Sequence, residues 1–227
     1  MSWQRARSPE QKGERRRAIL DAAAALFCGR EYEAVSLNAI ARQVGLAKSN
    51  LYRYFETKEQ IFIQIYLEDV GEWVELAERV LEPLAGCNDP DRVARELTGA
   101  LVARPRMLSL LALLSGVLER NLSLETVIEF KTVVNSFAHR LVMALRAALP
   151  GVTDESMIRF IIRMHAVVVG LWPMANPCEI VRQALARPEF SYMRVDFGRE
   201  LEAALRGLLG ELLAESRQPG PVFGVVE

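Results

Sequence analysis

The sequence predicts an all-α protein with a small N-terminal group of three helices followed by a larger helical bundle. Apolar residues recur at intervals of three and four along most of the chain, and no sustained period-2 segment is present. With 227 residues, 51% of them hydrophobic, the chain is long enough to bury a sizeable core. Its helix breakers divide it into about nine or ten helices: Gly45, the stretch 83–90, Pro105, Pro150-Gly151, Pro173, Pro177 and Pro188.

The composition fits a folded cytoplasmic protein. Three cysteines, Cys28, Cys87 and Cys178, are odd in number and far apart, so they give neither a CxxC pair nor a disulfide framework. No apolar run reaches the roughly 18 residues that a membrane span needs. The Arg-rich N-terminus lacks the apolar region of a secretory signal.

Charge is distributed unevenly along the chain. Residues 1–60 contain 11 Lys and Arg against 7 Asp and Glu, a net charge of +4. Residues 61–227 contain 17 against 22, a net charge of −5. A basic N-terminal part on an acidic body is expected where one part binds an anion, although solvated faces alone also produce such a difference.

The N-terminal part begins with basic residues. Residues 1–14 are polar and predict an irregular arm, with Arg5, Arg7 and Lys12 ahead of the run Arg15-Arg16-Arg17. The first helix is predicted from Glu14 to Gly29, with one face formed by Ile19, Ala23, Leu26 and Phe27. Such an arm either contacts phosphate and the minor groove of DNA or only aids solubility.

The next segment has the spacing of a helix-turn-helix. Ser36 can cap a helix that ends at Gly45, a residue suited to the left-handed conformation of a helix C-terminus. The small Ala41 permits a steep helix crossing, and a miniature core is expected from Ile40, Val44, Leu46 and Leu51. The second short helix, starting near Ala47, would then lie in a DNA major groove.

This segment has two other interpretations. An ordinary helical hairpin would explain a single Ala-Gly pair, but the complete ordered set after an Arg-rich helix favours DNA binding. An all-α scaffold that binds protein, without sequence-specific DNA recognition, would explain the body but not the N-terminal segment.

Several runs in residues 14–66 match one known pattern: Ile19-Leu20-Asp21-Ala22-Ala23, Phe27, Ser36-Leu37-Asn38-Ala39-Ile40-Ala41, Gly45, Leu51-Tyr52-Arg53-Tyr54-Phe55 and Thr57-Lys58-Glu59. The segment resembles the TetR family of transcriptional repressors. The resemblance implies a DNA-binding domain over residues 15–60, a ligand-binding and dimerisation domain over 61–215 and an irregular tail over 216–227. It implies a homodimer that binds a palindromic double-stranded operator and is released by a small-molecule inducer; an activator would use the same parts.

Predicted DNA contacts cluster around the second short helix. Lys48, Ser49 and Asn50 occupy its first turn, where they can reach bases, and Arg53 can contact guanine or phosphate. The resemblance assigns phosphate contacts to Tyr52 and Lys58, and Thr57 with Gln60 forms a capping box beside Lys58. The complete predicted set is Arg17, Ser36, Lys48, Ser49, Asn50, Tyr52, Arg53, Tyr54 and Lys58.

The body is predicted as a succession of amphipathic helices. Expected spans are about 58–84, 90–102 after the Asp89 cap, 104–121, 123–149, 154–171 and 195–214. In the family, the first of these transmits ligand binding to the DNA-binding domain by a pendulum-like shift. The last two are too apolar for one exposed face each, which predicts either a four-helix dimer interface or burial in the same chain. The predicted interface comprises Phe160, Met164, Val168, Leu201, Ala204, Leu205 and Leu208, with Ala203, Gly207 and Gly210 permitting close approach.

A ligand pocket is expected among the body helices, apolar with a few polar points. Its candidates are Trp73, Met107, Leu111, Glu119, Phe130, Asn135, His139, His165 and Trp172. His139 and His165 have no carboxylate or cysteine at metal-ligand spacing, so no metal site is expected.

Enzyme signatures are missing from the sequence. It contains no G-x-S-x-G, P-loop, G-x-G-x-x-G or HExxH, and its two histidines form no acid–base constellation. We therefore expect neither catalysis nor a cofactor.

Overall fold

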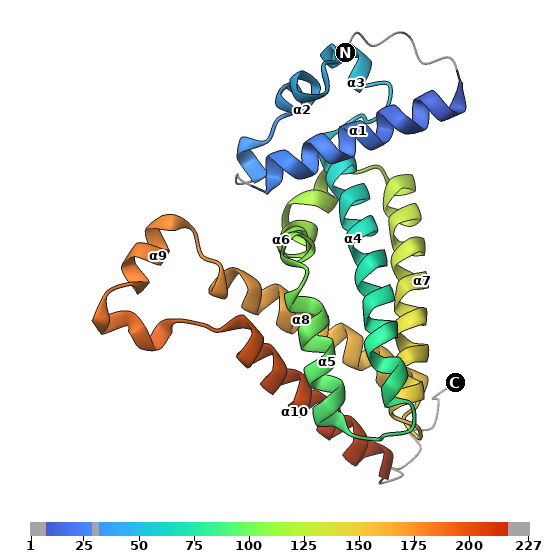
Figure 1. Cartoon of the computed structure of the whole chain (residues 1–227), viewed down its shortest axis with the longest axis vertical. Helices are drawn as coiled ribbons and strands as arrows, with labels where there is room; N and C mark the ends of the chain where they lie inside the picture. Colours follow the sequence, from blue (N-terminus) through green and yellow to red (C-terminus); the bar gives the residue numbers. More distant parts are fainter. Residues whose placement is uncertain (1–7, 29–31, 218–227) are drawn as a thin grey trace, which may run out of the picture. The chain divides into compact units, whose positions relative to one another are not determined.

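The computed structural model describes residues 8–28 and 32–217, and within them every regular element is helical (Figure 1). The predicted all-α class is confirmed. Two compact units form: Met1–Val70 with Leu113–Val133, and Gly71–Ala112 with Val134–Glu227. The first unit is discontinuous in sequence, so its limits differ from the expected division after residue 60.

The first helix, α1, spans Pro9–Phe27 and begins earlier than expected. The Ser8 side chain accepts a hydrogen bond from the Gln11 N–H at 3.3 Å, and Pro9 occupies the first helical turn, where its missing N–H has no cost. Residues 9–14, expected in the irregular arm, are therefore helical. Arg5 and Arg7 lie outside the described residues.

Two short helices follow the turn Tyr32–Ala34. Helix α2, Leu37–Val44, is capped by Ser36, whose hydroxyl accepts from the Ala39 N–H at 3.2 Å. Gly45 ends it in the left-handed region with φ 74°, and α3, Lys48–Leu51, starts two residues later. The predicted helix-turn-helix boundaries are confirmed at both caps. We refer to α1, α2, α3 and the first turns of α4 as the head.

The head has its own apolar core. Ile19 of α1, Ile40 of α2 and Leu51 of α3 have no exposed surface. Phe62 of α4, a helix that spans Lys58–Leu81, is equally buried. The Phe62 ring meets the edges of Phe27 and Tyr32 at centroid distances of 5.4 and 5.1 Å. This core fixes α3 relative to α1 and α2.

The stretch predicted as one helix over 104–121 changes geometry along its length. It consists of α6, Pro105–Leu113, a π-helical turn over Leu114–Leu118 and a 3-10 turn over Glu119–Asn121. Helix α7, Leu124–Ala148, then starts after Ser123, whose hydroxyl accepts from the Thr126 N–H at 3.2 Å. In the first unit, the ring centroids of Tyr66 and Phe130 lie 6.1 Å apart.

The second unit is organised around the last long helix. Helix α10, Phe197–Arg217, packs on α5, Pro90–Val102, and on α8, Asp154–Ala175. Helix α8 continues through Pro173, past its expected end at residue 171. Helix α10 includes residues 216 and 217, which were expected in the tail; residues 218–227 lie outside the described part. The buried residues of these three helices include Val93, Leu97, Leu101, Met157, Phe160, Met164, Val168, Leu201, Leu205 and Leu209.

Residues 176–196 leave this bundle as an excursion between α8 and α10, which we call the arm (Figure 1). It contains α9, Glu179–Leu185, and a 3-10 segment, Pro188–Met193. None of the residues of these two elements, all of them described, is buried. The sequence pattern does not predict this excursion.

Of the helices described, α8 alone is long and apolar enough to cross a membrane by length and composition, although such a test is also passed by helices of soluble proteins. Only 22% of its most apolar window is buried within the chain. Most of this apolar window therefore stays uncovered by the chain itself.

Candidate DNA-binding site

The helix-turn-helix presents the first turn of α3 to solvent. Lys48, Ser49 and Asn50 are all exposed. On the opposite side of α3, Leu51 is completely buried, so the helix cannot rotate without uncovering its anchor. These three side chains occupy the positions predicted for base contacts.

The turn between α2 and α3 holds that anchor in place. Past the left-handed Gly45, the Leu46 N–H donates to the Ala41 carbonyl at 2.9 Å. Leu46 and Ala41 are both buried. The angle between the two helices is therefore fixed by backbone hydrogen bonds and by small, closely packed side chains.

Further polar side chains extend the exposed face beyond α3. Arg53 is exposed and Tyr52 retains 46% of its surface. The Lys48 ammonium lies 5.7 Å from the centre of the Tyr52 ring, which places one cation beside one phenol. Tyr54 is half-buried, and exposed Ser36 uses its hydroxyl oxygen to cap α2.

Lys58, which is predicted to contact a phosphate, is half-buried and has partners within the head. Its ammonium donates to the Tyr32 carbonyl at 3.0 Å and lies 3.8 Å from the centre of the Tyr32 ring. Burial lowers the pKa of Lys58, while Glu59 and Glu33 oppose that shift. The Tyr32 hydroxyl donates to Glu59 at 3.0 Å. Burial of the phenol is the largest cause that raises its pKa, and the nearby Glu59 carboxylate raises it further. Lys58 thus ties the start of α4 to the segment before α2, and two of its three N–H donors are left for a phosphate.

The arginines of α1 also have partners inside the first unit. Arg17 forms a 2.7 Å ion pair with Glu68 of α4, and its own side chain remains 59% exposed. Arg16, which was not in the predicted set, lies 4.3 Å over the Phe55 ring and donates to the Tyr54 carbonyl at 3.3 Å. It supports the turn after α3 from behind. Sequence inspection offers no sign of these pairs, because the partners lie 38 and 51 residues away.

The predicted pocket residues do not form a single described cavity. In the first unit, Phe130 is buried and Glu119 forms a 2.6 Å ion pair with Lys131. In the second unit, Met107, Leu111 and Trp73 are buried.

The remaining candidates in the second unit are less enclosed. Trp172 is half-buried, and its indole N–H donates to Ser109 at 3.1 Å. Asn135, His139 and His165 are exposed, which corrects the expectation that they line an apolar pocket.

Trp73 has a feature that the sequence could not show. Among the described side chains, its indole N–H and the Thr98 hydroxyl are the buried polar groups that lack a hydrogen-bond partner. Leaving such a donor unsatisfied costs about 1–3 kcal/mol. A ligand oxygen is one group that would satisfy it.

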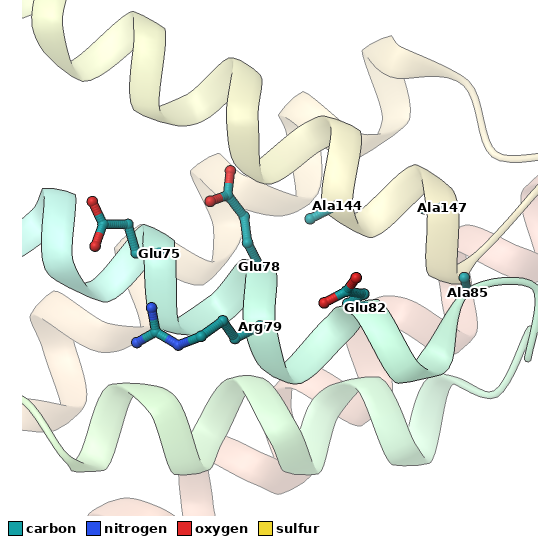
Figure 2. Close-up of a pocket in the computed structure, with 7 residues that line it drawn as sticks. All are labelled: Glu75, Glu78, Arg79, Glu82, Ala85, Ala144 and Ala147. Carbon is teal, nitrogen blue, oxygen red and sulfur yellow. The ribbon is translucent and has the colours of Figure 1, made fainter.

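A surface groove of about 480 Å³ lies along α4 and α7. Figure 2 shows Glu75, Glu78 and Arg79 on α4 and Glu82 in the 3-10 turn Glu82–Leu84 that follows it, with Ala144 and Ala147 on α7 opposite them. Glu78 binds the Arg140 guanidinium through two hydrogen bonds, which lowers the pKa of its carboxyl. None of the predicted pocket residues lines this groove, and within residues 8–28 and 32–217 no three metal-ligating side chains come together.

The predicted dimer interface needs correction because most of its residues are covered by their own chain. Phe160, Met164 and Val168 of α8 are buried. Leu201 and Leu205 of α10 have no exposed surface at all. Ala204 and Leu208 are half-buried. The five buried residues belong to the core that α8, α10 and α5 share, so they are unavailable to a partner.

The opposite faces of the same helices are largely uncovered, and apolar residues lie there among exposed charged ones such as Arg159, Arg163 and Glu211. On α8 this outer face comprises Ile158, Ile162, Ala166, Val169, Gly170 and Pro173; on α10 it comprises Ala203, Gly207, Gly210 and Ala214. A Cβ added at Gly170, Gly207 or Gly210 would meet no atom of the chain within 4 Å. Packing inside one chain therefore does not explain why these positions are small.

Two family models together match nearly the whole described chain. Residues 19–65 match the model described as bacterial regulatory proteins, tetR family, and residues 67–215 match the tetracyclin repressor-like C-terminal domain.

Curated relatives match in part of their length. The fatty acid metabolism regulator protein of Bacillus subtilis is 32% identical over 76 residues, which covers 34% of this chain and 39% of that protein. The HTH-type transcriptional repressor KstR of Mycolicibacterium smegmatis is 41% identical over 54 residues, 24% of this chain and 26% of that protein. The chain thus matches well under half the length of these relatives.

Solved structures share the fold over most of the chain. A possible TetR family regulator from Streptomyces coelicolor aligns with a TM-score of 0.60 and 21% identity, covering 88% of this chain and 98% of that one. The fatty acid degradation regulator FadR from Bacillus halodurans aligns with a TM-score of 0.56 and 17% identity, covering 92% and 98%. Since one of the two family models alone spans more than half of the residues, the chain belongs to the TetR family of transcriptional regulators.

Proposed function

We propose that this regulator is a homodimeric repressor that binds an inverted-repeat operator and releases it when a small molecule binds. The observation that carries the proposal is the exposed first turn of α3, with Lys48, Ser49 and Asn50 held outward over the buried Leu51. A repressor of this kind acts in the cytoplasm, where the DNA is.

The head divides its contacts between bases and phosphates. Asn50 presents an amide, which can pair bidentately with adenine in the major groove. Lys48, Tyr52 and Arg53 surround it with two cations and a phenol suited to phosphate oxygens. The contribution of Lys58 is a phosphate contact through the two donors that Tyr32 leaves unused.

The dimer forms through the outer faces of α8 and α10. A two-fold axis would place each apolar outer face against its copy, and the alanines and glycines of α10 let two helices approach closely. Members of the family typically act as dimers, and a palindromic operator requires two heads. Arg163–Glu211 and Arg159–Glu215, at 3.0 and 3.1 Å, bridge α8 and α10 within each chain beside this face.

The inducer is proposed to be a mostly apolar small molecule with a hydrogen-bond acceptor. Support comes from the buried Trp73 N–H without a partner and from the buried Met107 and Leu111 of α6. Ligand binding in the second unit would change the separation of the two heads and lower operator affinity. Two relatives named above are regulators of fatty acid metabolism or degradation, which is consistent with an apolar effector.

Selection from a random duplex library tests the DNA-binding part of this proposal. We expect the purified protein to enrich an inverted repeat with half-sites separated by about one helical turn or more. A variant with Lys48→Ala and Asn50→Ala should enrich nothing under the same conditions. Failure of the unaltered protein to enrich any sequence, despite intact helicity, would favour the protein-binding scaffold.

A further inference from the structure

We propose that the arm, residues 176–196, clasps the second copy of this chain at the edge of the dimer interface. This inference rests on the dimer proposed above and assigns the arm a role that the paired helices alone do not require. The surface proposed to contact the second copy consists of the exposed apolar side chains of α9 and of the segment Pro188–Met193.

The arm is internally ordered although it has no core. The Arg194 guanidinium donates to the Leu185 and Ala186 carbonyls at 2.7 and 2.9 Å. These bonds join the C-terminal end of α9 to the segment that leads into α10. Arg182 pairs with Glu179 and donates to the Pro177 carbonyl at 3.2 Å. Helix α9 has only 7 residues, and isolated helices below about 12 residues are marginal in water. A cover from outside the chain would supply the burial that the arm lacks.

Large apolar side chains stand on the arm in unusual number. Five of them lie within fourteen residues and remain largely exposed: Ile180 (76%), Val181 (44%), Phe190 (38%), Tyr192 (82%) and Met193 (52%). Scattered single apolar residues are normal on a surface, whereas a cluster of this kind indicates an interaction site.

The attachment of the arm points to a second copy as its occupant. The chain leaves α8 at Ala175 and returns at Phe197, the first residue of α10, so both ends of the arm belong to the two helices of the proposed interface. The apolar outer face of α8 runs on through Pro173 and Met174 towards the arm. A partner that packs on the outer faces of α8 and α10 would therefore lie next to the arm.

The root of the arm is fixed while its outer part is free of the core. The Trp172 and Phe197 rings meet edge to face at 5.0 Å. Trp172 also donates its indole N–H to Ser109, whose own hydroxyl donates to the Pro105 carbonyl at 3.0 Å. A fixed root limits the directions in which the arm can reach.

The charges of the arm argue against an anionic occupant. Residues 176–196 contain three arginines, Arg182, Arg187 and Arg194, and three acidic residues, Glu179, Glu189 and Asp196, so their formal net charge is zero. Arg182 and Arg187 are each paired with a carboxylate of the arm. A nucleic acid or an anionic membrane would gain no net electrostatic attraction here. A largely apolar protein surface fits better.

Photocrosslinking tests where the arm lies. We would replace Tyr192 with p-benzoylphenylalanine in the full-length protein and irradiate it at concentrations where sedimentation shows a dimer. The expected product is a covalent dimer on a denaturing gel, with the crosslink mapped by mass spectrometry to the partner. The same amino acid at Leu124, exposed on α7 in the first unit, should give no covalent dimer. Crosslinks within one chain only would overturn the proposal.

A dissociation measurement gives a second, independent readout. The double substitution Ile180→Ser with Tyr192→Ser should raise the dimer dissociation constant about tenfold or more, because two apolar side chains per protomer lose their cover. Arg187→Ser, on the same arm, should leave it unchanged. Helicity should survive in all variants, since none of these side chains is buried. An unaltered protein that is monomeric would overturn the dimer and the arm together, whereas a dimer indifferent to the double substitution overturns the arm alone.

Discussion

At the scale of single residues, the head separates side chains that face solvent from side chains that hold the fold. Lys48, Ser49 and Asn50 are exposed, whereas Arg16 and Lys58 bridge distant segments. The exposed set could be predicted from sequence because the helix-turn-helix spacing fixes which side of α3 is outward. The bridges could not, because Lys58 and Arg16 bind residues 26 and 38 positions away.

Asn50 tests base recognition. Asn50→Ala should weaken operator binding by about 1–3 kcal/mol while leaving non-specific binding nearly unchanged, because the lost amide pairs with a base edge. Fluorescence anisotropy with operator and with random duplex measures both. Asn135→Ala, at an exposed asparagine of α7, is the matched control and should change neither. Equal losses on both duplexes would remove Asn50 from sequence recognition.

A substitution at Lys58 tests whether this residue both stabilises the head and contacts phosphate. Lys58→Met keeps the apolar stem but removes the bond to Tyr32 and the cation over its ring, so the head should lose about 1–2 kcal/mol of stability. Binding to all duplexes should also weaken, and the salt slope should fall by about one unit per half-site. Lower stability with an unchanged slope would show that Lys58 only positions the head.

At the scale of elements, the helix caps were the most predictable features. Ser36 and Asp89 each accept hydrogen bonds at the start of the helix expected from them, and Ser123 and Thr153 do the same at the starts of α7 and α8. Such caps are local, so the sequence specifies them without knowledge of the fold. The cap at Ser8 was not predicted, because the arginine run after it favoured an irregular N-terminal segment over residues 1–14.

Two glycines of the head should respond oppositely to alanine. Gly45→Ala should destabilise the head by about 1 kcal/mol, because φ 74° is strained for a residue with a Cβ. Gly13→Ala should stabilise it by about 0.5–1 kcal/mol, since Gly13 is helical in α1 and its added Cβ would meet no atom within 4 Å. Denaturant midpoints of both variants compare them directly. A shift in the same direction for both would refute this explanation of the turn.

The face of α8 and α10 that we propose meets a partner could not be predicted from periodicity. Both helices have two apolar sides: large residues such as Phe160 and Leu205 on one, and smaller or β-branched residues such as Gly207 and Ile162 on the other. The larger side chains suggested the interface, but the core of the second unit uses them. Burial, and not hydrophobicity, distinguishes the two sides.

At the scale of the whole molecule, one pair of substitutions separates fold from assembly. Ile162→Glu places a charge on a side chain that is 62% exposed in the single chain, so the protein should stay helical but become monomeric. Leu205→Glu buries a charge at a position with no exposed surface and should unfold the second unit, at a cost of several kcal/mol. Circular dichroism and light scattering after size exclusion distinguish these results. A dimeric, folded Ile162→Glu variant would place the interface elsewhere.

The division of the chain into units was only partly accessible from sequence. The head boundary followed from its motif, but nothing in the order of residues indicates that Leu113–Val133 groups with the first 70. That grouping depends on long-range packing, such as the contact of Tyr66 with Phe130. The arm escaped prediction for the opposite reason, since a segment without buried residues leaves no amphipathic pattern.

Binding of the purified dimer to the DNA upstream of its own coding sequence tests the central claim most directly. An electrophoretic shift at about 0.15 M salt should show a discrete complex, while a permuted duplex of equal composition should bind at least about a thousandfold more weakly. The complex should contain two protomers for each operator. Equal affinity for the permuted duplex, or a complex with one protomer, would contradict the account of a dimeric, sequence-specific repressor.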